Sequence, residues 1–189
     1  MAVIFCTKKF IFGLGNYGAD YQDTRHNAGF LFINYLQEKL NLPSFSYNKK
    51  ILSEITSSRE LYLVKPRTYM NLSGEAVAKT LSYFSSFDFD NLAQFDFNQV
   101  FVAHDDLDLK IGEFKVQKGV GPKQHNGLLS IYQALGSQDF WHIRFGIDDR
   151  ERSRKIPPEN YVLQKIPQDQ IKKLTANFFQ ITQQLGLVN

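Results

Sequence analysis

The sequence predicts an α/β protein built as one three-layer domain over residues 1–189. Short β-prone runs alternate along the chain with segments whose apolar residues recur at helical spacing, a pattern typical of a sheet covered by helices. A chain of 189 residues with 43% apolar content fits one ordinary globular domain with a sizeable core.

In the first half of the chain the pattern predicts three strands and two helices. The strands are expected at residues 10–12, 51–56 and 61–64, and the helices at 27–40 and 73–84. Gly13 ends the first strand in a turn, Pro43 closes the first helix, and Pro66 stops the third strand. Ser73 is expected to be the N-cap of the second helix, because its hydroxyl can accept from a free backbone N–H.

The second half begins with an irregular stretch rich in Phe and Asp at 87–98, expected to be a surface loop. Further strands are expected at 100–103, 114–116 and 143–147, and helices at 128–135 and 170–185. The strand at 100–103 delivers Asp105 near its carboxyl end. Ligands gather outside the carboxyl ends of strands in open α/β sheets, so Asp105 and Asn16, which follows the first strand, are site candidates.

The composition favours a soluble, cytoplasmic protein. Cys6 is the single cysteine, which excludes an intramolecular disulfide, agrees with a reducing compartment and is expected to be structural. The start of the chain lacks the pattern of a signal peptide, and no apolar run approaches the ~20 residues of a membrane span.

The net charge of +3 is too small to indicate a nucleic-acid partner by itself. Between Lys110 and Lys155, however, nine basic residues exceed the five acidic ones by four. This region could meet a phosphate backbone or form a solvated face of mixed charge.

Residues 13–18, Gly-Leu-Gly-Asn-Tyr-Gly, match the pattern G-x-G-x-x-G after a strand. A dinucleotide-binding motif should open a helix at once and meet an acidic residue ~20 positions on, at the end of a second strand. Here polar loop residues follow, and the position twenty on lies in a helical pattern. We therefore expect no cofactor, and a turn that exposes Asn16.

His26 stands just before the first helix, and the strand-end carboxylate of Asp105 could orient it and stabilise its charged form. Such a pair makes a workable general base near neutral pH. A divalent-metal site in the run His104-Asp105-Asp106-Leu107-Asp108 is the rival interpretation. On an extended strand, however, Asp105 points away from His104 and Asp106, so these side chains cannot all converge.

Amide side chains are concentrated in two further loops. Asn71 lies in the loop at 65–74. Its side-chain amide could hydrogen-bond a peptide backbone as both donor and acceptor, or Asn71 could simply be a turn residue. Asn126 lies before a helix whose N–H end could stabilise an oxyanion. No G-x-S-x-G elbow is present, which favours direct attack by an activated water over an acyl-enzyme.

These segments together resemble the bacterial peptidyl-tRNA hydrolase family. The matching runs, in the family's order, are Gly-Leu-Gly-Asn at 13–16 with Tyr21, Thr-Arg-His-Asn-Ala-Gly at 24–29, Lys-Pro at 65–66 with Tyr-Met-Asn-Leu-Ser-Gly at 69–74, His-Asp-Asp-Leu-Asp-Leu at 104–109, His-Asn-Gly-Leu at 125–128 and Arg-Phe-Gly-Ile at 144–147. They cover roughly residues 9 to 165. Any one of them would be weak evidence, whereas six in order are highly specific.

The resemblance implies a monomer with a twisted, mixed central sheet flanked by helices and without metal or organic cofactor. It implies hydrolysis of the ester between peptide and tRNA in peptidyl-tRNA, which recycles tRNA from aborted translation. It makes His26 the general base that activates water and Asp105 the carboxylate that holds and charges it. The other implied roles are peptide binding by Asn16 and Asn71, shaping of the cleft by Met70 and Tyr21, positioning and oxyanion stabilisation by Asn126, and a tRNA phosphate contact by Arg144.

Two positions depart from the family's pattern. The segment before His125 is usually glycine-rich, and here it contains Pro122, which fixes φ and removes an N–H donor. Gln117 stands where the family tends to place a lysine for the tRNA 5′-phosphate. The candidates for that phosphate contact are Arg144, Lys115, Lys118 and Lys123.

Two alternatives come from other functional classes. A protein of this fold could bind RNA without cleaving an ester, although the intact set of candidate residues argues against lost activity. A metal-dependent hydrolase could use the carboxylates of Asp105, Asp106 and Asp108. Ester cleavage in the presence of a chelator would separate all three hypotheses.

Overall fold

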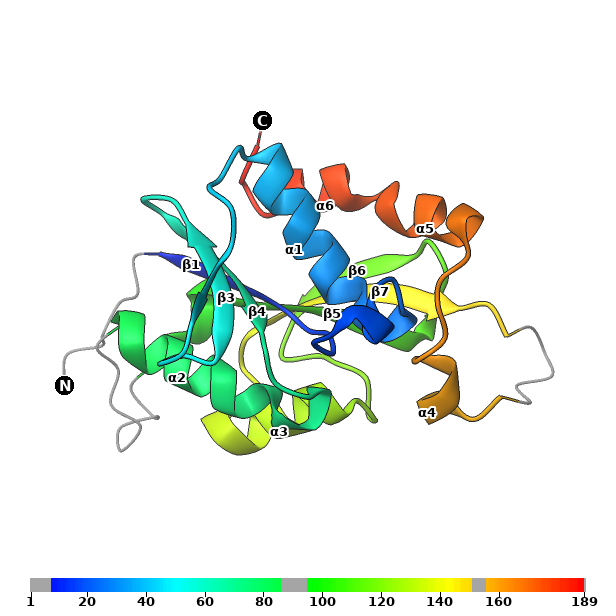
Figure 1. Ribbon diagram of the computed structural model, residues 1–189, viewed down its shortest axis with the longest axis horizontal. Helices are drawn as coiled ribbons and strands as arrows, with labels where there is room; N and C mark the ends of the chain where they lie inside the picture. Colours follow the sequence, from blue (N-terminus) through cyan, green and yellow to red (C-terminus); the bar gives the residue numbers. More distant parts are fainter. Residues whose placement is uncertain (1–7, 86–94, 151–155, 189) are drawn as a thin grey trace.

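A seven-stranded mixed sheet forms the centre of the computed structural model, which describes residues 8–85, 95–150 and 156–188 (Figure 1). The strands are β1 (Lys9–Gly13), β2 (Ser46–Asn48), β3 (Ser53–Ser57), β4 (Leu61–Pro66), β5 (Val100–Lys110), β6 (Phe114–Lys118) and β7 (Trp141–Asp148). Their order is β2-β3-β4-β1-β5-β7-β6. The central four strands are parallel, and β2, β3 and β6 join in antiparallel pairs. The expected α/β fold is confirmed.

Helices cover both faces of this sheet (Figure 1). They are α1 (Ala28–Lys39), α2 (Ser73–Ser85), α3 (Asn126–Leu135), α4 (Pro158–Tyr161), α5 (Gln168–Thr175) and α6 (Phe178–Gln184). On β1, Ile11 packs with α1 and the C-terminal helices, whereas Phe10 and Phe12 pack with α2 and α3. Successive residues of a strand face opposite sides, so a central strand buried on both faces consists almost entirely of apolar residues.

The N-terminus of α1 lies directly on the backbone of the sheet. A Cβ added to Gly29 would lie 2.3 Å from the carbonyl oxygen of Ala103, and one added to Gly13 would lie 2.5 Å from the carbonyl oxygen of Gly29. Only glycine permits backbones to approach so closely. The residues just before α1 are thereby held beside the carboxyl ends of β1 and β5.

The strand prediction at 100–103 was too short, because β5 continues to Lys110 and so includes Asp105. Pairing with β7 satisfies the backbone of this longer strand, with Asp105 opposite Phe145 and a register shift between Asp106 and Lys110. β2 was not predicted, since it is a three-residue edge strand with little buried surface.

The single last helix predicted at 170–185 is in fact the pair α5 and α6. The break falls at Ala176 and Asn177, where the Asn177 side chain donates to the carbonyl oxygen of Gly112 at 2.5 Å. Ser73 is not an N-cap: it is already helical, and its hydroxyl donates to the Met70 carbonyl at 2.8 Å. The 3-10 turn η3 (Met70–Leu72) runs straight into α2 and leaves no capping position there.

Two expectations fall on residues that the structure does not describe. Cys6 lies outside the described residues, as do residues 87–94 of the expected loop at 87–98. The end of that loop is described and forms the 3-10 turn η5 (Phe97–Gln99). Within the described ranges, no helix combines the length and apolar character needed to cross a membrane.

Candidate active site

His26 and Asp105 meet at the carboxyl end of the sheet. His26 lies in the 3-10 turn η2 (Arg25–Asn27), and its Nδ1 is 2.8 Å from Oδ1 of Asp105 on β5. The carboxylate can only accept, so Nδ1 carries the proton and Nε2 is left to act as a base. No described residue hydrogen-bonds Nε2. The structure thus brings together the two side chains that the sequence analysis paired.

The electrostatics of this pair suit a base that must become charged. Burial lowers the pKa of His26, but the adjacent Asp105 carboxylate outweighs it and raises that pKa above the ordinary 6.5. Burial raises the pKa of Asp105, yet His26 and His125 together hold it well below its usual range. Asp105 is therefore an anion at neutral pH, and its charge favours the protonated form of the His26 ring.

The turn that carries His26 is fastened to the C-terminal segment of the chain. The His26 backbone N–H donates to the Val162 carbonyl at 2.8 Å. The Arg25 guanidinium donates to the Gln170 side chain at 2.7 Å and lies 4.4 Å from the centre of the Tyr161 ring. Arg25 was not singled out from the sequence, where only its position next to His26 could have indicated it.

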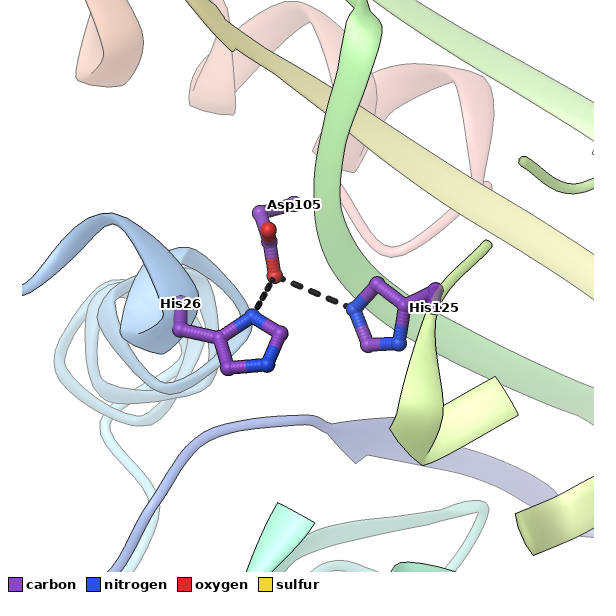
Figure 2. A group of neighbouring side chains, drawn as sticks. All are labelled: His26, Asp105 and His125. Atoms are coloured by element: carbon purple, nitrogen blue, oxygen red, sulfur yellow. Dashed lines mark hydrogen bonds and ion pairs between the residues drawn. The ribbon is translucent and has the colours of Figure 1, made fainter. Parts of the chain in front are cut away.

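His125 is a third member of the group, and sequence reasoning missed its role. Its Nε2 lies 3.1 Å from the same Oδ1 of Asp105. Figure 2 shows the rings of His26 and His125 both joined to this carboxylate. Its Nδ1 accepts from the Leu128 backbone N–H at 3.3 Å, so His125 is the N-cap of α3. Because Nδ1 is an acceptor, Nε2 must carry the proton that faces Asp105. One carboxylate oxygen thus receives two histidine N–H groups.

The other two histidines lie on the opposite side of β5. His104 Nδ1 donates to the Asp105 carbonyl at 2.9 Å, and its Nε2 lies 3.3 Å from Nδ1 of His142. Burial, reinforced by the neighbouring histidines, lowers the pKa of His104 well below 6.5. Burial and Arg144 lower the pKa of His142 to about 4. Both rings are therefore neutral at physiological pH, and both are fully buried.

The carboxylates proposed as a metal site diverge. Asp106 accepts from Arg144 Nε at 2.6 Å on the face away from Asp105, and Asp108 is exposed. A different group could in principle hold a cation, since His26, Asp105 and His125 have potential ligand atoms within 4.8 Å of one another. Its ring nitrogens at Asp105 carry protons, however, and His125 is fixed in that form by the N-cap of α3. The arrangement fits proton transfer better than metal binding.

Asn16 is buried rather than exposed as expected, because its hydrogen bonds tie it into a corner beside His26. Its side-chain oxygen accepts from the Met70 backbone N–H at 2.9 Å, which joins the turn after β1 to η3. Asn27 closes the same corner: its Oδ1 accepts from the Asn16 N–H at 2.8 Å, and its Nδ2 donates to the Asn16 carbonyl at 3.0 Å. Asn16 Nδ2 has no described partner and so remains available to a ligand. Asn27 was not predicted as a site residue.

The remaining candidates for peptide binding surround this corner. Met70 is buried, and its sulfur lies 2.5 Å from the position a Cβ on Gly127 would take, so η3 packs on the start of α3. Asn71 and Asn126 are both exposed, and Asn126 lies in the first turn of α3. The side chain of neither residue hydrogen-bonds a described residue. Tyr21 is half-buried at the end of the turn η1 (Ala19–Tyr21).

The candidates for phosphate contact differ in availability. Lys123 is exposed and Lys115 projects from β6. Lys118 is ion-paired with Asp139 at 3.1 Å. Arg144 is only 7% exposed, because it is bound to Asp106 and also donates to Gln117 at 2.9 Å.

Comparison with known proteins agrees with this geometry. A family model described as peptidyl-tRNA hydrolase matches residues 10–188. A peptidyl-tRNA hydrolase of Rickettsia canadensis is 36% identical over 95% of this chain and 92% of its own, and one of Lawsonia intracellularis is 41% identical over 89% and 79%. The crystal structure of peptidyl-tRNA hydrolase from Acinetobacter baumannii superposes with a TM-score of 0.78 at 28% identity, covering 96% of this chain and 88% of that one.

Proposed function

The chain belongs to the peptidyl-tRNA hydrolase family, and we propose that it cleaves peptidyl-tRNA with a water molecule activated by His26 and Asp105. Hydrolysis of this ester frees the tRNA from its peptide. The observation that carries the mechanism is the state of the His26 ring. Its Nδ1 is bound to a buried carboxylate, and its Nε2 has no described partner.

In this mechanism His26 Nε2 takes a proton from water while the oxygen of that water attacks the ester carbonyl. Asp105 stabilises the charge that develops on the ring, and His125 fixes the carboxylate by donating to the same oxygen. The proton then passes from His26 to the departing ribose oxygen. A positioned base of this kind contributes roughly 10²–10⁴ in rate, and the reaction needs no covalent intermediate.

Five further residues are proposed to bind the substrate. Asn16 Nδ2 and the exposed Asn71 amide are placed to hydrogen-bond a peptide backbone, and Met70 and Tyr21 to line its path. Asn126 is proposed to assist the oxyanion, because it lies at the N-terminal end of α3, where helix N–H groups favour negative charge.

The tRNA backbone is proposed to contact the basic side chains near β6. Lys123 and Lys115 are the most available, whereas Lys118 must exchange its partner Asp139 for a phosphate. Arg144 remains a candidate, but its bonds to Asp106 and Gln117 support a second role in holding β5, β6 and β7 together. A cytoplasmic location accords with a substrate that arises in translation. The expectation of a monomer can be tested by sedimentation.

The decisive experiment measures the release of free tRNA from an N-acylated aminoacyl-tRNA, with EDTA present. We expect the wild type to cleave it and His26→Ala to lose at least 10² in turnover. Thermal melting of both proteins would check that the variant is folded. Equal cleavage by the two would refute the role of His26. Binding of tRNA without cleavage by either would favour the alternative of a non-catalytic RNA-binding protein.

A further inference from the structure

A cavity of about 370 Å³ opens beside Asn16, on the side of the Asn16–Asn27 corner that faces the turn η1 and strands β3 and β4. Asn16 and Asn27 form one wall, and Phe30 and Leu31 of α1 supply an apolar part of the lining. Asn27 follows His26 directly in the chain. A peptide held by Asn16 therefore lies within reach of both the catalytic base and this cavity, whose volume is ample for an amino-acid side chain.

Most of the charge in the cavity is already paired. Lys65 lies 3.1 Å from Glu54, donates to the Asn34 side chain at 2.9 Å and sits 3.9 Å from the centre of the Phe45 ring. Glu54 also lies 3.5 Å from Arg67. Arg67 does not belong to the lining, and within the lining the charges of Lys65 and Glu54 balance each other.

Asp23 is different: it belongs to the lining of the cavity, and its carboxylate has no hydrogen bond or ion pair with any described residue. Its backbone is held in the left-handed region with φ 58°, an unusual conformation for a residue other than glycine. The Asp23 carbonyl accepts from the Ile166 backbone N–H at 2.8 Å, which fastens this turn to the C-terminal segment. The Asp23 backbone is thus held at the wall of the cavity, and no cation of a described residue neutralises its carboxylate.

We propose that this cavity receives a side chain of the peptide and that Asp23 makes it favour a basic one. The aliphatic stem of a lysine or arginine would pack on Phe30 and Leu31 while its cation meets the Asp23 carboxylate. The proposal rests on the function proposed above and concerns either of the two peptide residues next to the ester. An acidic side chain gains nothing here, because Lys65 is already paired.

The test compares lysine with methionine, an uncharged side chain of similar length, in N-acetyl dipeptides carried by one tRNA. In one pair of substrates, lysine or methionine is the residue joined to the tRNA and alanine is the second residue. In the other pair, alanine is joined to the tRNA and lysine or methionine is the second residue. We expect kcat/KM to favour lysine at one of them by about two- to fivefold, the size of a partly exposed ion pair. Added salt should weaken the preference.

Asp23→Asn removes the charge while keeping the shape, and asparagine tolerates the left-handed backbone. The ratio of lysine to methionine should fall to about one in this variant. Asp20→Asn is the matched control, since Asp20 is an exposed carboxylate of η1 that does not line the cavity. Cleavage of both substrates at equal rates by the wild type, or a preference that survives in Asp23→Asn, would overturn the proposal. Absence of any cleavage would instead count against the proposed function.

Discussion

Asp105→Asn separates the charge of the carboxylate proposed to assist His26 from its hydrogen bonds. Both histidines donate to Oδ1, so an asparagine whose amide oxygen occupies that position can still accept from both. No described residue bonds to Oδ2, where the new amide nitrogen would lie. The substitution therefore removes the negative charge with little change in geometry.

The expected effect follows from the 2.8 Å contact between Asp105 and His26. Two opposite charges about 4 Å apart attract by ~4 kcal/mol at an effective dielectric constant of ~20, and burial opposes part of this. Without the carboxylate, only burial remains, and burial lowers the pKa of His26, so this pKa should fall below its ordinary value of 6.5. The base must be neutral, so the acid limb of kcat/KM should move to lower pH by the same amount.

The assay is tRNA release from an N-acylated aminoacyl-tRNA between pH 5 and 9. On the plateau we expect Asp105→Asn to lose about 10²–10⁴ in kcat, since nothing then stabilises the imidazolium. Asp108→Asn provides the control, because it makes the same change at an exposed site on β5. A variant with near-normal kcat, or with an acid limb at the wild-type pH, would refute the role assigned to Asp105.

Three other substitutions test the scaffold of the site. His125→Ala removes the N-cap of α3, so the free energy of unfolding in urea should fall by about 1 kcal/mol. We expect kcat to fall less than in Asp105→Asn. Unchanged stability would contradict the capping role. Arg144→Met leaves the Asp106 carboxylate buried without its cation, so the free energy of unfolding in urea should fall by about 3–5 kcal/mol. A variant of unchanged stability that binds tRNA more weakly would argue against this structural role. Gly29→Ala places a Cβ 2.3 Å from a backbone oxygen and should lower stability by about 1–3 kcal/mol in thermal melting. An unaltered melting temperature would show that α1 can shift away from the sheet.

The pairing of His26 with Asp105 could be predicted because each residue stands next to an element that the sequence pattern reveals. A strand at 100–103 and the alternation of side chains place Asp105 on one face, and a histidine before the first helix lies at the same edge of the sheet. The position of Asn16 near that edge follows from the same rule, whereas Met70 was expected there only from the resemblance to the family. The direct hydrogen bond between them could not be predicted, because it depends on how closely the turn after β1 and η3 approach each other in space.

The role of His125 could not be read from the sequence for a similar reason. Histidine is not a typical N-cap, and its second contact depends on where α3 lies relative to β5. The break between α5 and α6 likewise reflects a tertiary bond, from Asn177 to Gly112, and the local pattern of apolar residues runs through it without interruption. Local periodicity contains no information about such distant partners.

The glycine contacts beneath α1 allow the thermal stability of the protein to be changed without changing the geometry of its site, although these two properties often compete in enzymes. Gly13 and Gly29 bring main chain against main chain, so the start of α1 and the turn before it rest on atoms that every sequence shares. Side chains deeper in that layer, such as Phe32 and Phe178, can be exchanged for others of similar total volume while His26 keeps its support. The core is therefore the place to raise the thermal stability of this hydrolase at constant catalytic geometry.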